Sequence, residues 1–129
     1  MKADKLISEL LMAFSRYAYA ASDLGVIEMP VSELEKDGAW KDWPQKVGVY
    51  YFRNGNEFLY VGRALLGTRL GARIWSQRRE GDEDWKKALA DTETRVGLVG
   101  FPDDLWFLAP SLEMYLVDIL EPRFNKKRG

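Results

Sequence analysis

The stretch from Val47 to Ile74, VGVYYFRNGNEFLYVGRALLGTRLGARI, constrains the fold of this chain more than any other part of it. It contains an Asn54-Gly55 pair between two runs rich in aromatic and β-branched residues, which is a strong signal for a β-hairpin. Apolar residues then recur at helical spacing from Leu65 to about Arg79. We therefore expect two antiparallel strands, with Gly55 at a positive φ in the turn, followed directly by a helix.

The register of this hairpin decides which side chains share a face, because successive side chains of a strand point to opposite sides. A loop of three residues would place Tyr50 opposite Tyr60 and Gly48 opposite Gly62, and would separate a hydroxyl-bearing face from a mostly apolar one. A loop of two residues would instead pair Tyr50 with Leu59. We prefer the three-residue loop, in which the paired glycines leave room for the backbone of a ligand to approach.

The N-terminal part of the chain shows a different pattern. Residues 4–22 predict an amphipathic helix, which either packs on the core or contacts a partner. Residues 25–46 look irregular, apart from a short helical turn at 32–35, because glycine and proline interrupt them. We expect one compact domain, in which residues 1–45 are an extension packed on a core formed by residues 46–129.

The C-terminal half completes the expected fold. A short helix is predicted near 84–90 and a third strand at 94–101. A last helix is predicted to start near Pro110 and to end before Pro122. The fold class is therefore α+β, with a small three-stranded antiparallel sheet flanked by helices and an extra N-terminal helix.

Composition limits the chemistry that this chain can perform. Its 129 residues suffice for one domain with a single core, and no apolar run approaches the length of a membrane span. Histidine is absent, which excludes imidazole bases and histidine metal sites. Cysteine is also absent, which excludes disulfides and thiolate metal sites and fits a cytoplasmic location. Acid–base work would fall to tyrosine, lysine or carboxylates. The 19 basic and 20 acidic residues argue against strong non-specific binding to nucleic acid.

Several short motifs occur in a particular order along the chain. GVY occupies positions 48–50, YVG occupies positions 60–62, and Arg69 follows the second motif by seven residues. Near the end of the chain, the string EMYLVDILEPRFN starts with Glu113 and ends with Asn125. Each motif is weak alone, but together they resemble the signature of the GIY-YIG nuclease superfamily.

This resemblance, which covers roughly residues 46–126, implies metal-dependent hydrolysis of phosphodiester bonds in DNA. Tyr50 and Tyr60 would sit in the site, where one of them, Tyr50 in preference, would help to activate the attacking water or act as general base. Arg69 would hold the scissile phosphate, and Glu113 would bind one Mg²⁺ or Mn²⁺ ion. A single pocket should therefore bring Tyr50, Tyr60, Arg69 and Glu113 together.

The resemblance also implies supporting residues. Arg63 stands where many members have lysine, directly after the second motif, and together with Arg73 it would contact the substrate phosphate. Gly48, Gly62 and Asn125 would shape the site without touching the substrate. Because the net charge is close to zero, a protein partner or a homodimer would supply additional affinity for DNA, and no membrane is involved.

A second function class stays open. The two tyrosines could simply pack across the hairpin, Arg69 could pair with a surface carboxylate, and Glu113 could be favoured only by a helix dipole. Many members of the superfamily carry a histidine or tyrosine four residues after the arginine, where this chain has Arg73. The alternative is therefore a catalytically weak or inactive module of the same fold, which binds DNA or a protein partner.

Overall fold

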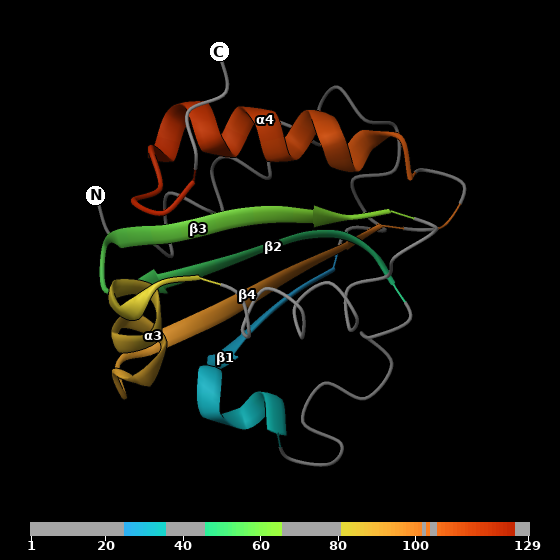
Figure 1. The fold of residues 1–129 in the computed structure, drawn as a ribbon. Helices are drawn as coiled ribbons and strands as arrows, with labels where there is room; N and C mark the ends of the chain where they lie inside the picture. Colours follow the sequence, from blue (N-terminus) through green and yellow to red (C-terminus); the bar gives the residue numbers. More distant parts are fainter. Residues whose placement is uncertain (1–24, 36–45, 66–80, 102, 104–105, 126–129) are drawn as a thin grey trace.

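The structure is a computed structural model that describes residues 25–35, 46–65, 81–101, 103 and 106–125 (Figure 1). The helix expected at 4–22 lies outside the described residues, as does all but the first residue of the helix expected at 65–79. Within the described parts of the chain, no helix is both long and apolar enough to cross a membrane.

The described elements form a sheet with helices on both of its faces. In chain order they are β1 (Gly25–Pro30), the 3₁₀ helix η2 (Val31–Glu35), β2 (Val47–Asn54), β3 (Glu57–Ala64), α3 (Glu83–Ala90), β4 (Thr94–Phe101) and α4 (Leu108–Leu120). All strand pairs are antiparallel, and the strand order is β1-β4-β2-β3. α4 lies on one side of the sheet, whereas α3 and η2 lie on the other (Figure 1). The expected α+β class is confirmed.

The sheet contains a strand, β1, where the sequence suggests irregular structure, so the expected three-stranded sheet is wrong. β1 begins at Gly25 and ends at Pro30, and this short run between two breakers gives little strand signal. Its conformation depends on β4, with which it pairs from Gly25 opposite Gly100 to Pro30 opposite Arg95. Proline is tolerated here because β1 is at the edge of the described sheet. The adjoining η2 matches the helical turn expected at 32–35.

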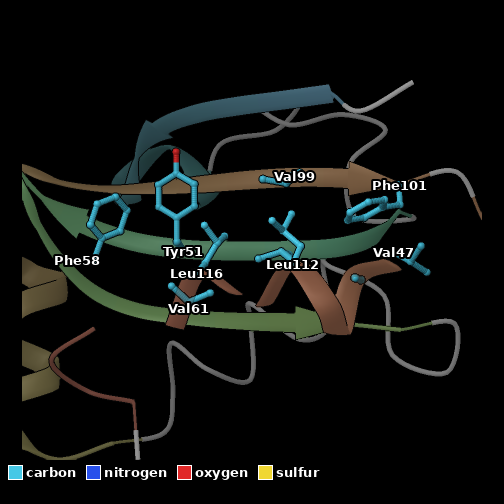
Figure 2. Packing of buried hydrophobic residues seen from close by; sticks show 10 residues of the cluster. Val47, Tyr51, Phe58, Val61, Val99, Phe101, Leu112 and Leu116 are labelled. Carbon is cyan, nitrogen blue, oxygen red and sulfur yellow. The ribbon is translucent and has the colours of Figure 1, made fainter. Parts of the chain in front are cut away.

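β2 is one of the two inner strands of the described sheet, because it pairs with β3 on one side and with β4 on the other. Its side chains from Val47 to Phe52 are buried, and they divide the core into two layers. The layer on the α4 face contains Val47, Val49, Tyr51, Phe58, Val61, Val99, Phe101, Ala109, Leu112 and Leu116 (Figure 2). The layer on the α3 face contains Met29, Val31, Leu34, Tyr50, Phe52, Leu59, Ala64, Trp85, Val96 and Leu98.

The loop of the β2–β3 hairpin is shorter than expected. Asn54 pairs with Glu57, which leaves a loop of two residues, and Gly55 has the expected positive φ of 58°. The three-residue loop is therefore wrong, and so is the direct pairing of the two tyrosines, because Tyr50 lies opposite Gly62.

A β-bulge in β3 compensates for the shorter loop. Phe52 pairs with Tyr60, whereas the next residue of β2 pairs with Phe58, so Leu59 is the additional residue. One additional residue reverses the facing of every side chain beyond it. Tyr60 consequently shares a face with Tyr50, as expected. Phe58 lies on the α4 face and Leu59 on the α3 face, whereas alternation from a three-residue loop would place Phe58 with Tyr50 and Leu59 with Tyr51.

A row of side chains crosses the sheet at Gly97. Glu28 of β1 and Tyr51 of β2 both lie opposite Gly97 of β4. A Cβ atom on Gly97 would lie 1.8 Å from Cζ of Tyr51, so the absent side chain is what lets the tyrosine ring cross β4. The Tyr51 hydroxyl donates a hydrogen bond to Glu28, and Nε of Arg53 donates to both carboxylate oxygens of Glu28 at 3.1 Å. These bonds tie the edge strand β1 to the middle of the sheet.

We expect Gly97→Ala to lower the free energy of unfolding by about 1–3 kcal/mol, the usual cost of overfilling a packed interior, because the new methyl group overlaps the Tyr51 ring. Urea denaturation measures this loss. Arg95→Ala, at an exposed position of the same strand, is the control and should change stability by less than about 0.5 kcal/mol. Equal midpoints for the two variants would contradict the crossing of Tyr51 over Gly97.

Candidate active site

Glu113 is positioned by α4, the last helix. The helix begins two residues before Pro110, and proline is tolerated in a first turn because its missing N–H would have no partner there. The helix ends before Pro122, as expected. Glu113 lies on the buried side of α4 next to Leu112, and only 2% of its surface is exposed. A carboxylate this deeply buried is costly unless a cation or hydrogen-bond donors compensate it.

Arg63 of β3 compensates the charge of Glu113. Its Nη1 atom lies 3.3 Å from Oε1 of Glu113, and the two side chains are 39% and 2% exposed. Arg63 lies opposite Val49 in the β2–β3 ladder and two residues after Val61, so it faces α4. The ion pair thus joins the residue that follows YVG to the glutamate of the C-terminal motif.

Tyr50 and Tyr60 lie on the other face of the sheet. Their rings stack at 6.0 Å with an interplanar angle of 27°. Phe52 and Trp85 surround them, since Phe52 meets the edge of Tyr50 at 6.1 Å and Trp85 packs at 5.8 Å from Tyr60. Tyr50 is fully buried, whereas Tyr60 is only partly buried. Of the two, Tyr60 is therefore the tyrosine that partly reaches solvent.

At Gly48 and Gly62, other atoms of the protein occupy the space that a side chain would need. A Cβ atom on Gly62 would lie 2.4 Å from the hydroxyl oxygen of Tyr50, so this glycine makes room for the Tyr50 ring. A Cβ atom on Gly48 would lie 1.9 Å from the carbonyl oxygen of Val99, so this glycine permits the close approach of β2 and β4. Gly48 pairs with Ala64, and the expected glycine pair that admits a ligand is wrong.

The expected convergence of all four catalytic candidates on one pocket is not found among the described residues. Tyr50 and Tyr60 belong to the α3 face, whereas Glu113 belongs to the α4 face. Arg69 and Arg73 lie outside the described residues. The two sets are connected by β3, which is the edge strand opposite β1 in the described sheet and carries both Tyr60 and Arg63.

Asn125 fastens the C-terminal segment to this edge strand. Its side-chain oxygen accepts a hydrogen bond from the Val61 amide at 2.9 Å, and its amide group donates to the Val61 carbonyl at 2.8 Å. The backbone amides of Arg123 and Phe124 donate to carbonyl oxygens earlier in β3, at 3.1 and 2.8 Å. Residues 123–125 therefore run along β3, a contact for which the sequence carries no signal except the motif that contains Asn125.

The donor set for a metal ion is small. No group of three or more carboxylates gathers among the residues that the structure describes. Glu113 is a single carboxylate that is already paired with a cationic side chain, so its surroundings accept positive charge. One carboxylate with room for water and phosphate oxygens suits Mg²⁺ or Mn²⁺, which take oxygen ligands.

The architecture defines a class of small α+β domains in which an antiparallel sheet carries helices on both faces. Comparison with solved structures identifies the fold more closely: it is that of the GIY-YIG N-terminal endonuclease domain of UvrC from Thermotoga maritima. The magnesium-bound form of that domain is 22% identical with a TM-score of 0.52, over 74% of this chain and 93% of that chain. The GIY-YIG resemblance expected from the motifs is thus confirmed at the level of the fold.

Two further structures of the UvrC domain are similar to this chain. They are tyrosine-to-phenylalanine point mutants bound to the catalytic divalent cation, 23% and 24% identical, each with a TM-score of 0.50. Each comparison covers 67% of this chain and 89% of that chain. No family model matches the sequence, and a comparison with curated proteins gives no match.

We expect Asn125→Ala to lower the free energy of unfolding by about 1–3 kcal/mol, because it leaves the Val61 amide and carbonyl without these partners. Amide hydrogen exchange at Val61 should accelerate in the same variant. Asn125→Asp has nearly the same shape and keeps the acceptor, but it cannot donate to the Val61 carbonyl, so it should also destabilise. Unchanged exchange at Val61 in both variants would contradict the contact.

Proposed function

We propose that this protein is a metal-dependent endonuclease that hydrolyses phosphodiester bonds in DNA. The observation that carries the proposal is the burial of Glu113 beside Arg63, in a chain with the fold of a domain that is solved with its catalytic divalent cation. A buried carboxylate on α4, next to a partly exposed arginine on an edge strand of the sheet, provides both a cation ligand and a phosphate ligand.

Glu113 would hold the ion, which we propose to be one Mg²⁺ or Mn²⁺. When bound, such an ion supplies electrostatic stabilisation of the negative charge that gathers on a reacting phosphate. Arg63 is the described arginine nearest to this carboxylate, and it would contact a substrate phosphate from β3. Arg69 and Arg73, which lie outside the described residues, stay predictions as the ligand of the scissile phosphate and as an additional phosphate contact.

We propose Tyr60, rather than the Tyr50 that the family resemblance favours, as the tyrosine that contacts the attacking water. Tyr60 is partly exposed, whereas Tyr50 is fully buried beneath it. Tyr50 would then fix the position of Tyr60 by stacking on its ring. Tyr60 and Arg63 are three residues apart on β3, which corresponds to about 10 Å along a strand, so DNA lying along this edge would reach both.

A second candidate is a module of this fold that binds DNA or a protein partner but cuts weakly or not at all. The separation of the two tyrosines from Glu113 on opposite faces of the sheet favours it. The net charge of −1 also suggests that a partner or a homodimer would assist DNA binding. The cytoplasmic location suggested by the absence of cysteine stays a prediction.

Cleavage assays with supercoiled plasmid and branched DNA test the endonuclease proposal. We expect cleavage with Mg²⁺ or Mn²⁺, none with EDTA, and a loss on the order of 10²-fold or more in Glu113→Gln, which keeps the shape of the side chain but removes its charge. Glu57→Gln, at an exposed position on β3, is the matched control and should cleave like the wild type. Equal cleavage by Glu113→Gln and the wild type would point to a contaminating nuclease, whereas binding without cleavage would favour the second candidate.

The two tyrosines can be separated in the same assay. Tyr60→Phe should reduce the cleavage rate on the order of 10²- to 10⁴-fold, as for the loss of a general acid or base, while Tyr50→Phe should reduce it less than about tenfold. Both variants keep the stacked rings, so each tests a hydroxyl group alone. A larger loss in Tyr50→Phe than in Tyr60→Phe would refute the assignment of Tyr60.

A further inference from the structure

We propose that Arg63 is an exchangeable counter-ion of Glu113, which competes with the divalent cation for this carboxylate and becomes available to phosphate when the cation binds. The proposal rests on the function proposed above, because it assumes that Glu113 holds the ion. It concerns what occupies this carboxylate in the metal-free protein, and it makes metal binding and substrate binding dependent on each other.

The metal-free protein requires a cation at this position. Glu113 is 2% exposed, and an ionised carboxylate at that depth is unfavourable without a compensating charge. The Arg63 guanidinium is a cationic group that meets this carboxylate, at 3.3 Å. Arg63 thus stabilises the site before any ion arrives.

The contact between Arg63 and Glu113 is also weak enough to be exchanged. Only Nη1 of Arg63 reaches Glu113, at a distance beyond the usual 2.7–2.9 Å or so of a charge-assisted hydrogen bond, and 39% of the Arg63 side chain is exposed. Because more than a third of its side chain is already exposed, Arg63 can leave the carboxylate without first opening the core.

Arg53 provides the contrast within the same protein. Its Nε atom bonds both carboxylate oxygens of Glu28, its Nη1 atom donates to the Gly55 carbonyl at 2.9 Å, and its side chain is only 11% exposed. Several bonds hold that guanidinium in a single geometry, as a permanent structural pair requires. The single long bond of Arg63 is the pattern of a replaceable partner.

Competition follows from the positions of the charges. A divalent cation on Glu113 and the Arg63 guanidinium would be like charges at one carboxylate, so each lowers the affinity of the site for the other. Once released, the guanidinium lies at the edge of the sheet, where a phosphate would provide a new partner. Metal and phosphate should therefore bind more tightly together than separately, because each favours the released state of Arg63.

Mn²⁺ titration of the metal-free protein without DNA tests the proposal, with free Mn²⁺ measured by its electron paramagnetic resonance signal. We expect Arg63→Gln to bind Mn²⁺ roughly three- to fivefold more tightly than the wild type, the upper end of the size expected for a partly exposed ion pair. Arg63→Lys keeps a cation and should lie between the two. The matched control is Arg123→Gln, which removes the same charge from an exposed pair with Glu57 and should stay within about twofold of the wild type.

The outcomes separate this proposal from the function on which it rests. If Glu113→Gln binds Mn²⁺ as tightly as the wild type, the ion is not held by Glu113 and the proposed metal site itself fails. If Glu113→Gln loses binding but Arg63→Gln binds no more tightly than Arg123→Gln, the metal site stands and the competition is refuted. Thermal denaturation adds a second measurement, in which Arg63→Gln should be less stable than the wild type without metal and should gain more from Mn²⁺. A smaller gain in Arg63→Gln than in the wild type would likewise overturn the competition.

Discussion

The pairing of β2 on both sides, together with its burial on both faces, is the constraint on which the rest of the described structure depends. A strand in this position separates two apolar layers, and each neighbouring helix packs against only one of them. The alternation along β2 sends Tyr50 toward α3 and Tyr51 toward α4. Chemistry that requires both Tyr60 and Glu113 must therefore take place at the edge of the sheet rather than in a pocket on one face.

Much of the fold can be predicted from local sequence signals. The Asn54-Gly55 pair marks the hairpin, the alternation from Thr94 to Phe101 marks β4, and Pro122 marks the end of α4. These signals act through the backbone conformation of a few neighbouring residues, so a single sequence is enough to show them. The order of the GIY-YIG motifs then led to the correct fold.

The parts that could not be predicted depend on contacts between distant segments. The bulge at Leu59 places the consecutive residues Leu59 and Tyr60 on the same face of the sheet, which a strict alternation cannot achieve, and β1 needs β4 beside it. The Arg63–Glu113 pair is of the same kind, because it depends on how α4 crosses the sheet. Motif spacing indicates Glu113 as a candidate, yet only the packing of the sheet shows that Arg63 pairs with it and that the two tyrosines lie on the other face.

The hydrogen bonds between residues 123–125 and β3 have a consequence for how this protein behaves among other chains. An uncovered strand edge is a template on which extended peptides assemble. Here the Asn125 side chain bonds the amide and carbonyl groups of Val61, much as a neighbouring strand would. Residues 123–125 therefore cover this part of the β3 edge. A peptide that added to this edge would have to displace residues 123–125 first. These few residues therefore disfavour the addition of a further strand beside β3.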